Sequence, residues 1–377
     1  MIFEFLGWSK NLTMSKTNNL PEITRKGIRH QNVEDYLLIT LLSFALSVSL
    51  TRLFLELTGY PQLGGGELHI AHVLWGGLFL FVASLLPLIF VNRWVYRWSA
   101  LLSGFGVGLF IDEVGKFITQ NNDYFYPAAA PVIYVFFLLI VLVYVIVRRP
   151  QPRTPRGEFY HVLKDLEEVL DRDLSDIELA RIHDRLSRIL RDSGDPVLIE
   201  FAANLMRFLE SDELVLRSEK PNLLQRWLQR LSQNEARYLP RNRFRAILSG
   251  GLGAWGIWAI LLPVYITIHL SQSAEIEKML TELVANRLVR DVISWSLFET
   301  RVGLQGAIGL LSLVGAILLW TKERRGIYIG YMSMLVSLTV VNPLLFYFEQ
   351  FSAIINALIQ FVLLIGILRY RKRYLLS

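Results

Sequence analysis

The fold is decided by two neighbouring stretches, TRLFLELTGYPQLGGGELHIAHVLWGG at 51–77 and GFGVGLFIDEVGKFITQNNDYFYP at 104–127. Both place ionisable residues within or beside long apolar runs. Charged side chains inside a membrane helix are costly, so a concentration of them indicates either structural ion pairs or a functional site.

Composition indicates a membrane protein. The 377 residues are 53% hydrophobic and 19% charged, with a mean hydropathy of +0.39. Several apolar runs reach about 20 residues, which is the length that crosses a bilayer as a helix. The net charge of +6 comes from basic residues at the ends of these runs. We interpret that basicity as membrane topology and predict no nucleic-acid partner.

Cysteine is absent from the chain. Disulfides, thiolate metal sites and cysteine nucleophiles are therefore excluded.

The sequence predicts an all-α integral membrane protein with about eight transmembrane helices and a cytoplasmic helical insertion. The expected spans are 36–57, 68–91, 99–118, 128–147, 247–270, 302–320, 327–348 and 351–368. The strongly basic boundaries fall on one side of this arrangement, which places both termini in the cytoplasm of a multi-pass cell-membrane protein.

Four regions follow from this assignment. They are a cytoplasmic N-terminal segment at 1–35, a first four-helix membrane unit at 36–147, a cytoplasmic helical domain at 148–245 and a second four-helix membrane unit at 246–377. The segment before Thr300 has apolar residues near helical spacing and is expected to lie along the outer interface. The lipid bilayer is the first predicted partner.

The insertion at 157–245 has amphipathic helical patterning. Ser175 with Glu178 predicts a capping box, and Asp195 followed by Pro196 predicts another helix start. A further helix is expected at Pro221–Leu231. No glycine-rich phosphate loop occurs, so no nucleotide site is predicted. A cytoplasmic protein partner, or self-association through 157–245, is expected instead.

A polar cluster is predicted at the outer ends of the first three spans. Counting about 1.5 Å of rise per residue places Arg52, His72 and Asp112 within roughly 10 Å of the outer boundary. The residues expected at shallower depth are Glu56, His69, Glu113, Lys116 and Asp123.

Structural interpretations of the same residues stay open. Arg52 with Glu56, and Asp112 with Lys116, have the i,i+4 spacing of intrahelical ion pairs. Long basic side chains can also extend to the headgroups.

A metal site is the first functional hypothesis. His69 and His72 share one helical face, and Asp112 or Glu113 would add a carboxylate. His269 could complete the ligand set of a divalent metal such as zinc. The remaining carboxylate would act as the catalytic general base of a metal-dependent membrane hydrolase.

Two alternatives remain. The cluster could serve a solute or proton transporter, in which histidine and carboxylates relay protons. The protein could also be a non-catalytic membrane scaffold that signals through its cytoplasmic helical domain. Whether it is an enzyme is therefore undecided by the sequence.

Glycines are expected to bring helices together near the cluster. Gly76, Gly77, Gly104 and Gly108 would allow the second and third helices to approach closely. In contrast, His30, His161 and His183 lie in polar or amphipathic segments and are interpreted as surface residues.

LHIAHVLWGG at 68–77 and FIDEVGKFITQNNDYF at 110–125 resemble stretches of uncharacterised bacterial multi-spanning membrane proteins. This resemblance covers about the first four spans and implies no activity. In kind, the cluster is also similar to the zinc sites of membrane hydrolases of the ceramidase and adiponectin-receptor type. Those proteins carry an HxxxH pair on a late helix, whereas the late spans here offer only His269.

Overall fold

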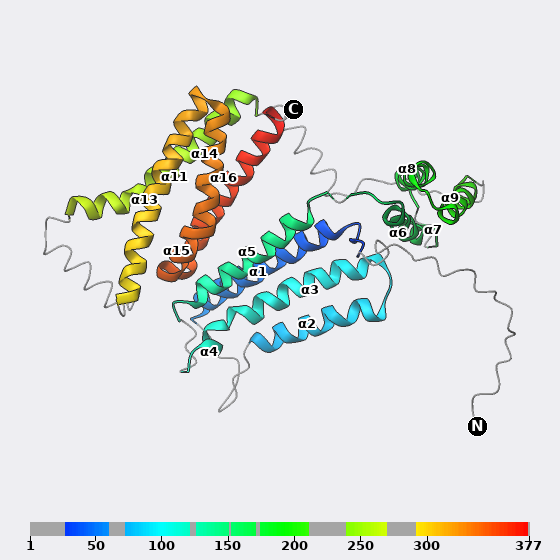
Figure 1. Ribbon diagram of the computed structural model, residues 1–377. Helices are drawn as coiled ribbons and strands as arrows, with labels where there is room; N and C mark the ends of the chain where they lie inside the picture. The colour runs from blue at the N-terminus through cyan, green and yellow to red at the C-terminus, as the bar shows by residue number, and fades with distance from the viewer. Residues whose placement is uncertain are drawn as a thin grey trace, which may run out of the picture. The chain divides into compact units, whose positions relative to one another are not determined.

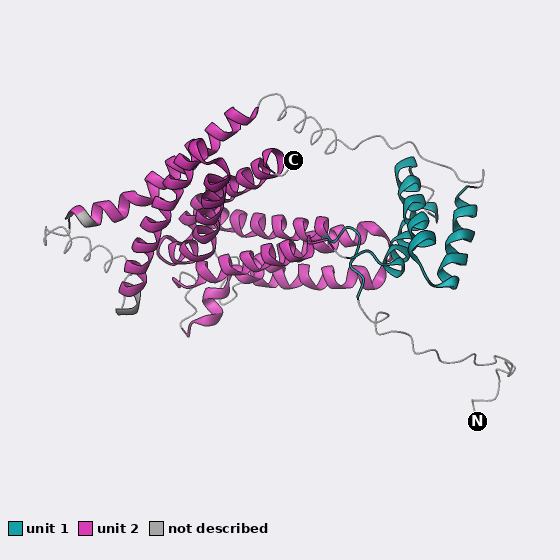
Figure 2. Ribbon diagram, turned by 45° about the horizontal axis from the view of Figure 1, so that its top comes forward, with its two compact units in different colours: residues 1–33, 151–220 teal, residues 34–150, 221–377 magenta. Residues whose placement is uncertain are grey.

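The computed structural model describes residues 27–59, 72–120, 126–150, 152–170, 174–210, 239–269 and 292–375. These residues are helical, with turns and short irregular connections between helices and no strand among them. The chain divides into two compact units (Figure 2). Unit 1 comprises 1–33 and 151–220, and unit 2 comprises 34–150 and 221–377.

Unit 2 begins with a group of mostly long helices that run side by side (Figure 1). They are α1 (Val33–Thr58), α2 (His72–Ile89), α3 (Arg93–Asp112), the short α4 (Val114–Ile118) and α5 (Ala129–Val147). Only three residues, 90–92, separate α2 from α3. A connection this short makes the two helices antiparallel neighbours.

Glycines allow close approach within this group, but at partly different positions from those expected. A Cβ added at Gly106 would lie 2.8 Å from the carbonyl oxygen of Gly76, and a Cβ at Gly76 would lie 2.8 Å from that of Gly106. This pair joins α2 to α3. Gly104 and Gly108 instead face Ser43 and Ser47 of α1, and Gly77 has no neighbour within 4 Å of its added Cβ. The expectation that Gly77, Gly104 and Gly108 bring α2 to α3 is therefore wrong.

The second group of helices in unit 2 contains a π-helical turn. It consists of α11 (Arg241–His269), α13 (Val292–Thr321), α14 (Glu323–Val336), η2 (Ser337–Val341, π-helical), α15 (Asn342–Glu349), η3 (Gln350–Ser352, 3-10) and α16 (Ala353–Tyr374). The chain reverses at Gln350, whose φ is 48°. Leu252, Leu319, Met334 and Ile367 are fully buried between α11, α13, α14 and α16.

One boundary in this group differs from the sequence prediction. The span at 302–320 was expected to follow a segment that lies along the outer interface. In the structure α13 begins at Val292 and continues to Thr321 without interruption. The part of that segment from Val292 to Thr300 therefore belongs to the first turns of a long helix, and its earlier part, 270–291, lies outside the described residues.

Six helical segments of the described residues are long and apolar enough to cross a membrane. They are Val33–Thr58, His72–Ile89, Ala129–Val147, Arg241–Ile266, Trp295–Thr321 and Glu323–Tyr374. The last of these contains the reversal at Gln350, and α3 is not among the six. The membrane class is supported, whereas the predicted count of eight is not confirmed.

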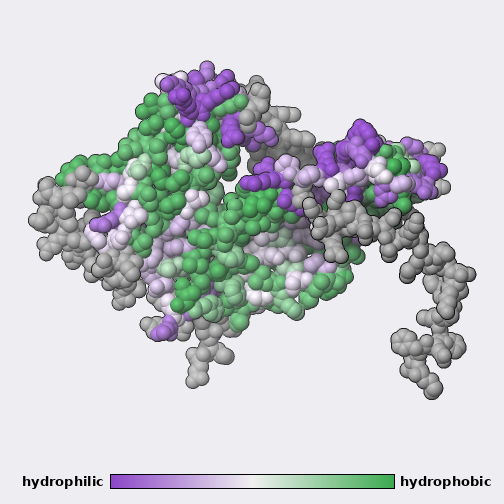
Figure 3. All heavy atoms as spheres, viewed as in Figure 1, coloured by the Kyte–Doolittle hydropathy of each residue, from purple (hydrophilic) through white to green (hydrophobic). Residues whose placement is uncertain are grey.

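The surface of unit 2 agrees with a lipid environment. Hydrophobic residues cover much of its visible helical surface (Figure 3). Leu88 is 80% exposed, and Ile317 and Ile355 are 65% and 67% exposed. Large apolar side chains turned outward along so many helices would be unfavourable in water.

Unit 1 is a small helical domain built on an apolar core. Its helices are α6 (Pro155–Asp165), α7 (Glu167–Leu170), α8 (Asp176–Asp192) and α9 (Pro196–Leu209). Val162, Ile182, Leu186, Ile189 and Ala202 are completely buried between them.

The predicted helix starts in unit 1 are confirmed. Ser175 and Glu178 form a reciprocal capping box at the start of α8. Asp195 caps α9, and Pro196 occupies its first turn. The helix expected at Pro221–Leu231 lies outside the described residues.

Candidate functional site

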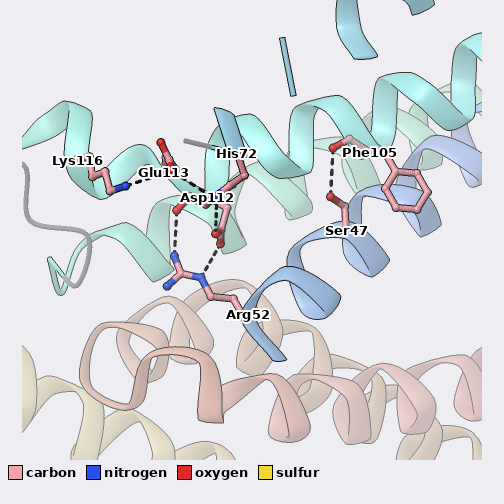
Figure 4. Close-up of polar contacts among 7 residues, drawn as sticks. All are labelled: Ser47, Arg52, His72, Phe105, Asp112, Glu113 and Lys116. Carbon is pink, nitrogen blue, oxygen red and sulfur yellow. Dashed lines mark hydrogen bonds and ion pairs between the residues drawn. The ribbon is translucent and has the colours of Figure 1, made fainter. Parts of the chain in front are cut away.

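Three helices of unit 2 bring ionisable side chains together at one end. Arg52 lies near the C-terminal end of α1, His72 begins α2 and Asp112 ends α3. Glu113 and Lys116 follow on the break after α3 and on α4. We call these five residues the Asp112 cluster (Figure 4).

Arg52 binds Asp112 across the α1–α3 contact. Its Nε lies 2.6 Å from Asp112 Oδ1, and its Nη2 donates to the Asp112 carbonyl oxygen over 2.9 Å. Both residues are buried, with Asp112 0% exposed and Arg52 7% exposed. The guanidinium carbon also lies 4.0 Å from the centroid of the Phe351 ring. Arg52 therefore links α1 both to α3 and to the turn before α16.

His72 lies between two carboxylates. Its Nε2 is 3.2 Å from Asp112 Oδ2, and its Nδ1 is 3.2 Å from Glu113 Oε1. Glu113 is 2% exposed, and its Oε1 is also 3.2 Å from Lys116 Nζ. The imidazole thus joins two ion pairs that would otherwise be separate.

The end of α3 explains this convergence. Glu113 has φ −89° and ψ 8°, so the regular helix stops there before α4 begins at Val114. In a continuous helix, adjacent residues project about 100° apart. The irregular position at Glu113 instead directs two successive carboxylates toward one histidine (Figure 4).

Arg52 and Lys116 make contacts other than the expected intrahelical pairs. Arg52 donates hydrogen bonds to α3, and Glu56 is exposed. Lys116 contacts Glu113, three residues before it. Burial favours the cross-helix pair, because an ionised group inside a membrane helix needs a partner shielded from lipid.

Several predicted site residues lie beyond what the structure describes. His69 and Asp123 are outside the described residues. His269 is the last residue of α11, and its side chain is not described. Of the eight ionisable residues predicted to share this end of the first three helices, the structure brings together Arg52, His72, Asp112, Glu113 and Lys116.

The described residues contain no group of three histidine, cysteine or acidic side chains that could hold a metal ion. The geometry gives a reason. Arg52 binds one oxygen of Asp112 and Lys116 faces an oxygen of Glu113. Two cations beside the carboxylates oppose the approach of a third cation.

A second polar group, which the sequence analysis did not predict, lies among α5, α15 and α16. Tyr134 Oη donates to the Leu338 carbonyl oxygen over 2.9 Å and accepts from Asn342 Nδ2 over 3.2 Å. Gln360 Nε2 donates to Asn342 Oδ1 over 3.2 Å. Asn342 and Gln360 are 0% and 1% exposed. The sequence offered one signal for this group, because Asn342 and Gln360 are polar carboxamides within otherwise apolar runs.

An apolar cavity lies beside this hydrogen-bonded group. Its volume is about 250 Å³, and its walls come from α1, α5, α15, η3 and α16. Tyr134 and Phe351 both line it. Tyr134 belongs to the hydrogen-bonded group, and the Phe351 ring is the one over which the Arg52 guanidinium lies.

Comparisons of the chain with protein-family models, with curated proteins and with solved structures find no match.

Proposed function

We propose that this protein handles protons, or a solute that moves with protons, through the Asp112 cluster. The observation that carries the proposal is the position of His72, whose two ring nitrogens each lie 3.2 Å from a carboxylate oxygen. Histidine is the side chain whose charge changes most readily near neutral pH.

The hydrogen-bond inventory supports a shared proton. A neutral imidazole has one donor nitrogen and one acceptor nitrogen, and an ionised carboxylate only accepts. Two ionised carboxylates flanking a neutral His72 would leave one nitrogen lone pair facing an oxygen lone pair. A second proton removes that conflict, either on the imidazole or on one of the carboxyl groups.

Proton binding changes the charge of a buried site. Arg52 and Lys116 balance Asp112 and Glu113, so the five residues are neutral when His72 is neutral. The shared proton makes the cluster positive. Because Asp112 and Glu113 are buried, a change of one unit there acts through a weakly screened environment.

A metal-dependent hydrolase receives less support from the described residues. Arg52 and Lys116 supply the positive charge that a metal would supply to the two carboxylates. Proton exchange does not require Arg52 or Lys116 to leave the carboxylates, because the proton can reside on His72 or on a carboxyl group that already contacts it.

We also propose eight spans, with both termini and unit 1 in the cytoplasm and the cluster facing outward. The basic residues at the boundaries support this orientation. Packing of α3 against α2 through Gly76 and Gly106 and the reversal at Gln350 within Glu323–Tyr374 support adding two spans to the six apolar segments.

Proton flux in liposomes tests the function. The full chain is reconstituted with a trapped pH-sensitive dye, and a potassium diffusion potential provides the driving force. We expect proton entry with the wild type and a reduction to the level of protein-free liposomes with His72→Gln. His183→Gln, which removes a histidine from α8 of unit 1, should retain the wild-type flux.

The liposome assay shows no flux if protons move only together with a solute. Nitrogen NMR of the histidine side chains then provides a second measurement. Asp112→Asn should change the number of N–H bonds on His72, because it replaces a carboxylate that lies 3.2 Å from the ring. A His72 signal unchanged by Asp112→Asn, together with equal flux in the wild type and His72→Gln, would exclude proton handling at this cluster.

A further inference from the structure

Unit 1 contains a pocket of about 360 Å³ whose walls come from two separate parts of the chain. One wall is Gly27–His30, which precedes α1. The other is formed by Arg156, Tyr160, His161 and Lys164 of α6. We call this the basic pocket.

The lining of the basic pocket is cationic. It contains Arg29, Arg156 and Lys164, together with the imidazoles of His30 and His161. Among the described residues, none that forms this lining carries a carboxylate. The Arg156 guanidinium carbon lies 5.3 Å from the Tyr160 ring centroid, which orients the cation beside a phenol that can also donate a hydrogen bond.

Acidic residues outside the pocket lining act on two of its members, Lys164 and His161. Lys164 Nζ is 2.7 Å from Glu167 Oε1. Glu158 and Asp165 act on His161 from its own helix, and Arg185 acts on it from α8. Glu167 thus pairs with Lys164, while the lining itself presents positive charge and N–H donors.

The position of the pocket along the chain indicates the source of an anion. His30 precedes the start of α1 at Val33 by three residues, and Arg156 follows the end of α5 at Val147 by nine. Both α1 and α5 are apolar enough to span a membrane. Chain segments this close to two span ends lie near the level of lipid headgroups, where basic pockets bind phosphorylated lipids.

We propose that the basic pocket binds the phosphate group of an anionic membrane lipid. Arginine and lysine form charge-assisted hydrogen bonds to phosphate oxygens, and Tyr160 and the histidines add further donors. The histidines at 30 and 161, interpreted from the sequence as surface residues, are instead part of a pocket.

The test measures lipid retained by the full chain. Protein is taken from nanodiscs of phosphatidylcholine mixed with phosphatidylglycerol, and bound lipid is counted by native mass spectrometry. We expect the wild type to retain phosphatidylglycerol and Arg156→Gln to lose it. Arg156→Lys should retain it in part, because the charge remains.

Arg191→Gln is the matched control. It removes the same charge from unit 1 at a position on α8 whose side chain is 72% exposed and pairs with its neighbour Asp192. Retention should be as in the wild type. Equal retention in the wild type, Arg156→Gln and Arg191→Gln would overturn the proposal.

A competition experiment distinguishes lipid from soluble phosphate. Inorganic phosphate is added to the wild type carrying phosphatidylglycerol. Continued lipid retention supports the lipid as ligand, whereas full displacement by inorganic phosphate would reject it in favour of a soluble anion. Circular dichroism of Arg156→Gln checks folding, and a fold matching the wild type assigns its lipid loss to the pocket.

Discussion

Asp112 is the residue on which the cluster depends most. Each of its carboxylate oxygens has its own partner, Arg52 for Oδ1 and His72 for Oδ2. Complete burial leaves water no role in stabilising the charge. Removing the cationic partner therefore leaves the desolvation cost of the buried carboxylate without compensation.

Arg52→Gln should lower the free energy of unfolding by about 3–5 kcal/mol, because it leaves the Asp112 carboxylate buried without its guanidinium. Thermal unfolding of the protein in detergent measures the effect. Arg148→Gln is the control, since its ion pair with Glu34 spans 3.6 Å and both side chains are largely exposed. Adding Asp112→Asn to Arg52→Gln should recover part of the loss. Equal melting temperatures for the two single variants would contradict this account.

His161 predicts a pH dependence for unit 1. Burial lowers the pKa of His161 from its ordinary value of 6.5, and Arg185 lowers it further. The unfolded chain consequently binds more protons than the folded unit once the pH falls below about 6.5. Stability is then lost as the pH falls toward the folded pKa, and the loss levels off below it.

His161→Gln should reduce this loss of stability on acidification, because glutamine does not titrate. Unfolding of unit 1 in the full chain, followed by hydrogen exchange at α6 and α8, measures it at several pH values. An unchanged pH dependence in the variant would assign the effect to other groups. The His183→Gln variant controls for loss of a histidine elsewhere in unit 1.

At the scale of elements, α2 and α3 approach so closely at Gly76 and Gly106 that an added Cβ would meet the backbone of the other helix. Gly106→Ala places a methyl group 2.8 Å from the Gly76 carbonyl oxygen. We expect a loss of about 1–3 kcal/mol in stability from overpacking. Gly77→Ala lies one residue from Gly76 and meets no atom within 4 Å, so its stability should be unchanged or higher. Detergent unfolding of the two variants gives the comparison, and a larger loss in Gly77→Ala would refute it.

Hydrogen bonds between Tyr134 and Asn342 and between Asn342 and Gln360 connect three helices. Arg52 likewise connects α1 to α3 through side-chain hydrogen bonds. Tyr134→Phe removes the hydroxyl that contacts both Leu338 and Asn342. Interhelical hydrogen bonds in membranes contribute about 0.6–1.7 kcal/mol, and we expect a loss in that range. In a double-mutant cycle with Asn342→Leu, purely additive losses would show that the two side chains do not stabilise each other.

Local sequence signals predicted individual elements better than contacts between them. The capping box at Ser175 and the start at Asp195 depend on residues a few positions apart, and both are confirmed. The Tyr134–Asn342 hydrogen bond joins residues 208 positions apart, and no periodic pattern indicates such a pairing. In the Asp112 cluster, the equal expected depth of His72 and Asp112 in the membrane predicted that the two residues would lie close together. The sequence could not predict that Arg52 binds Asp112, because that contact depends on how each helix is rotated about its axis.

At the scale of the whole molecule, the proposed topology places Gly194 and Gly65 on opposite sides of the membrane. Gly194 lies between α8 and α9, and Gly65 lies in the predicted outer loop. Protease sites or tags inserted at these positions should be accessible from opposite sides in sealed vesicles. Accessibility of both from the same side would reject eight spans with cytoplasmic termini.

In the proposed eight-span topology, the pairing of α2 with α3 has a consequence for how the chain enters the bilayer during synthesis. Arg93, Arg97 and Asp112 make α3 a poor insertion signal, and it is not among the six segments apolar enough to span alone. Its three-residue connection to α2 and the reciprocal Gly76–Gly106 contact allow the pair to insert together as a helical hairpin. The translocation machinery would then recognise α2 and admit α3 with it, so the acidic end of α3 would reach the far side only as part of that hairpin.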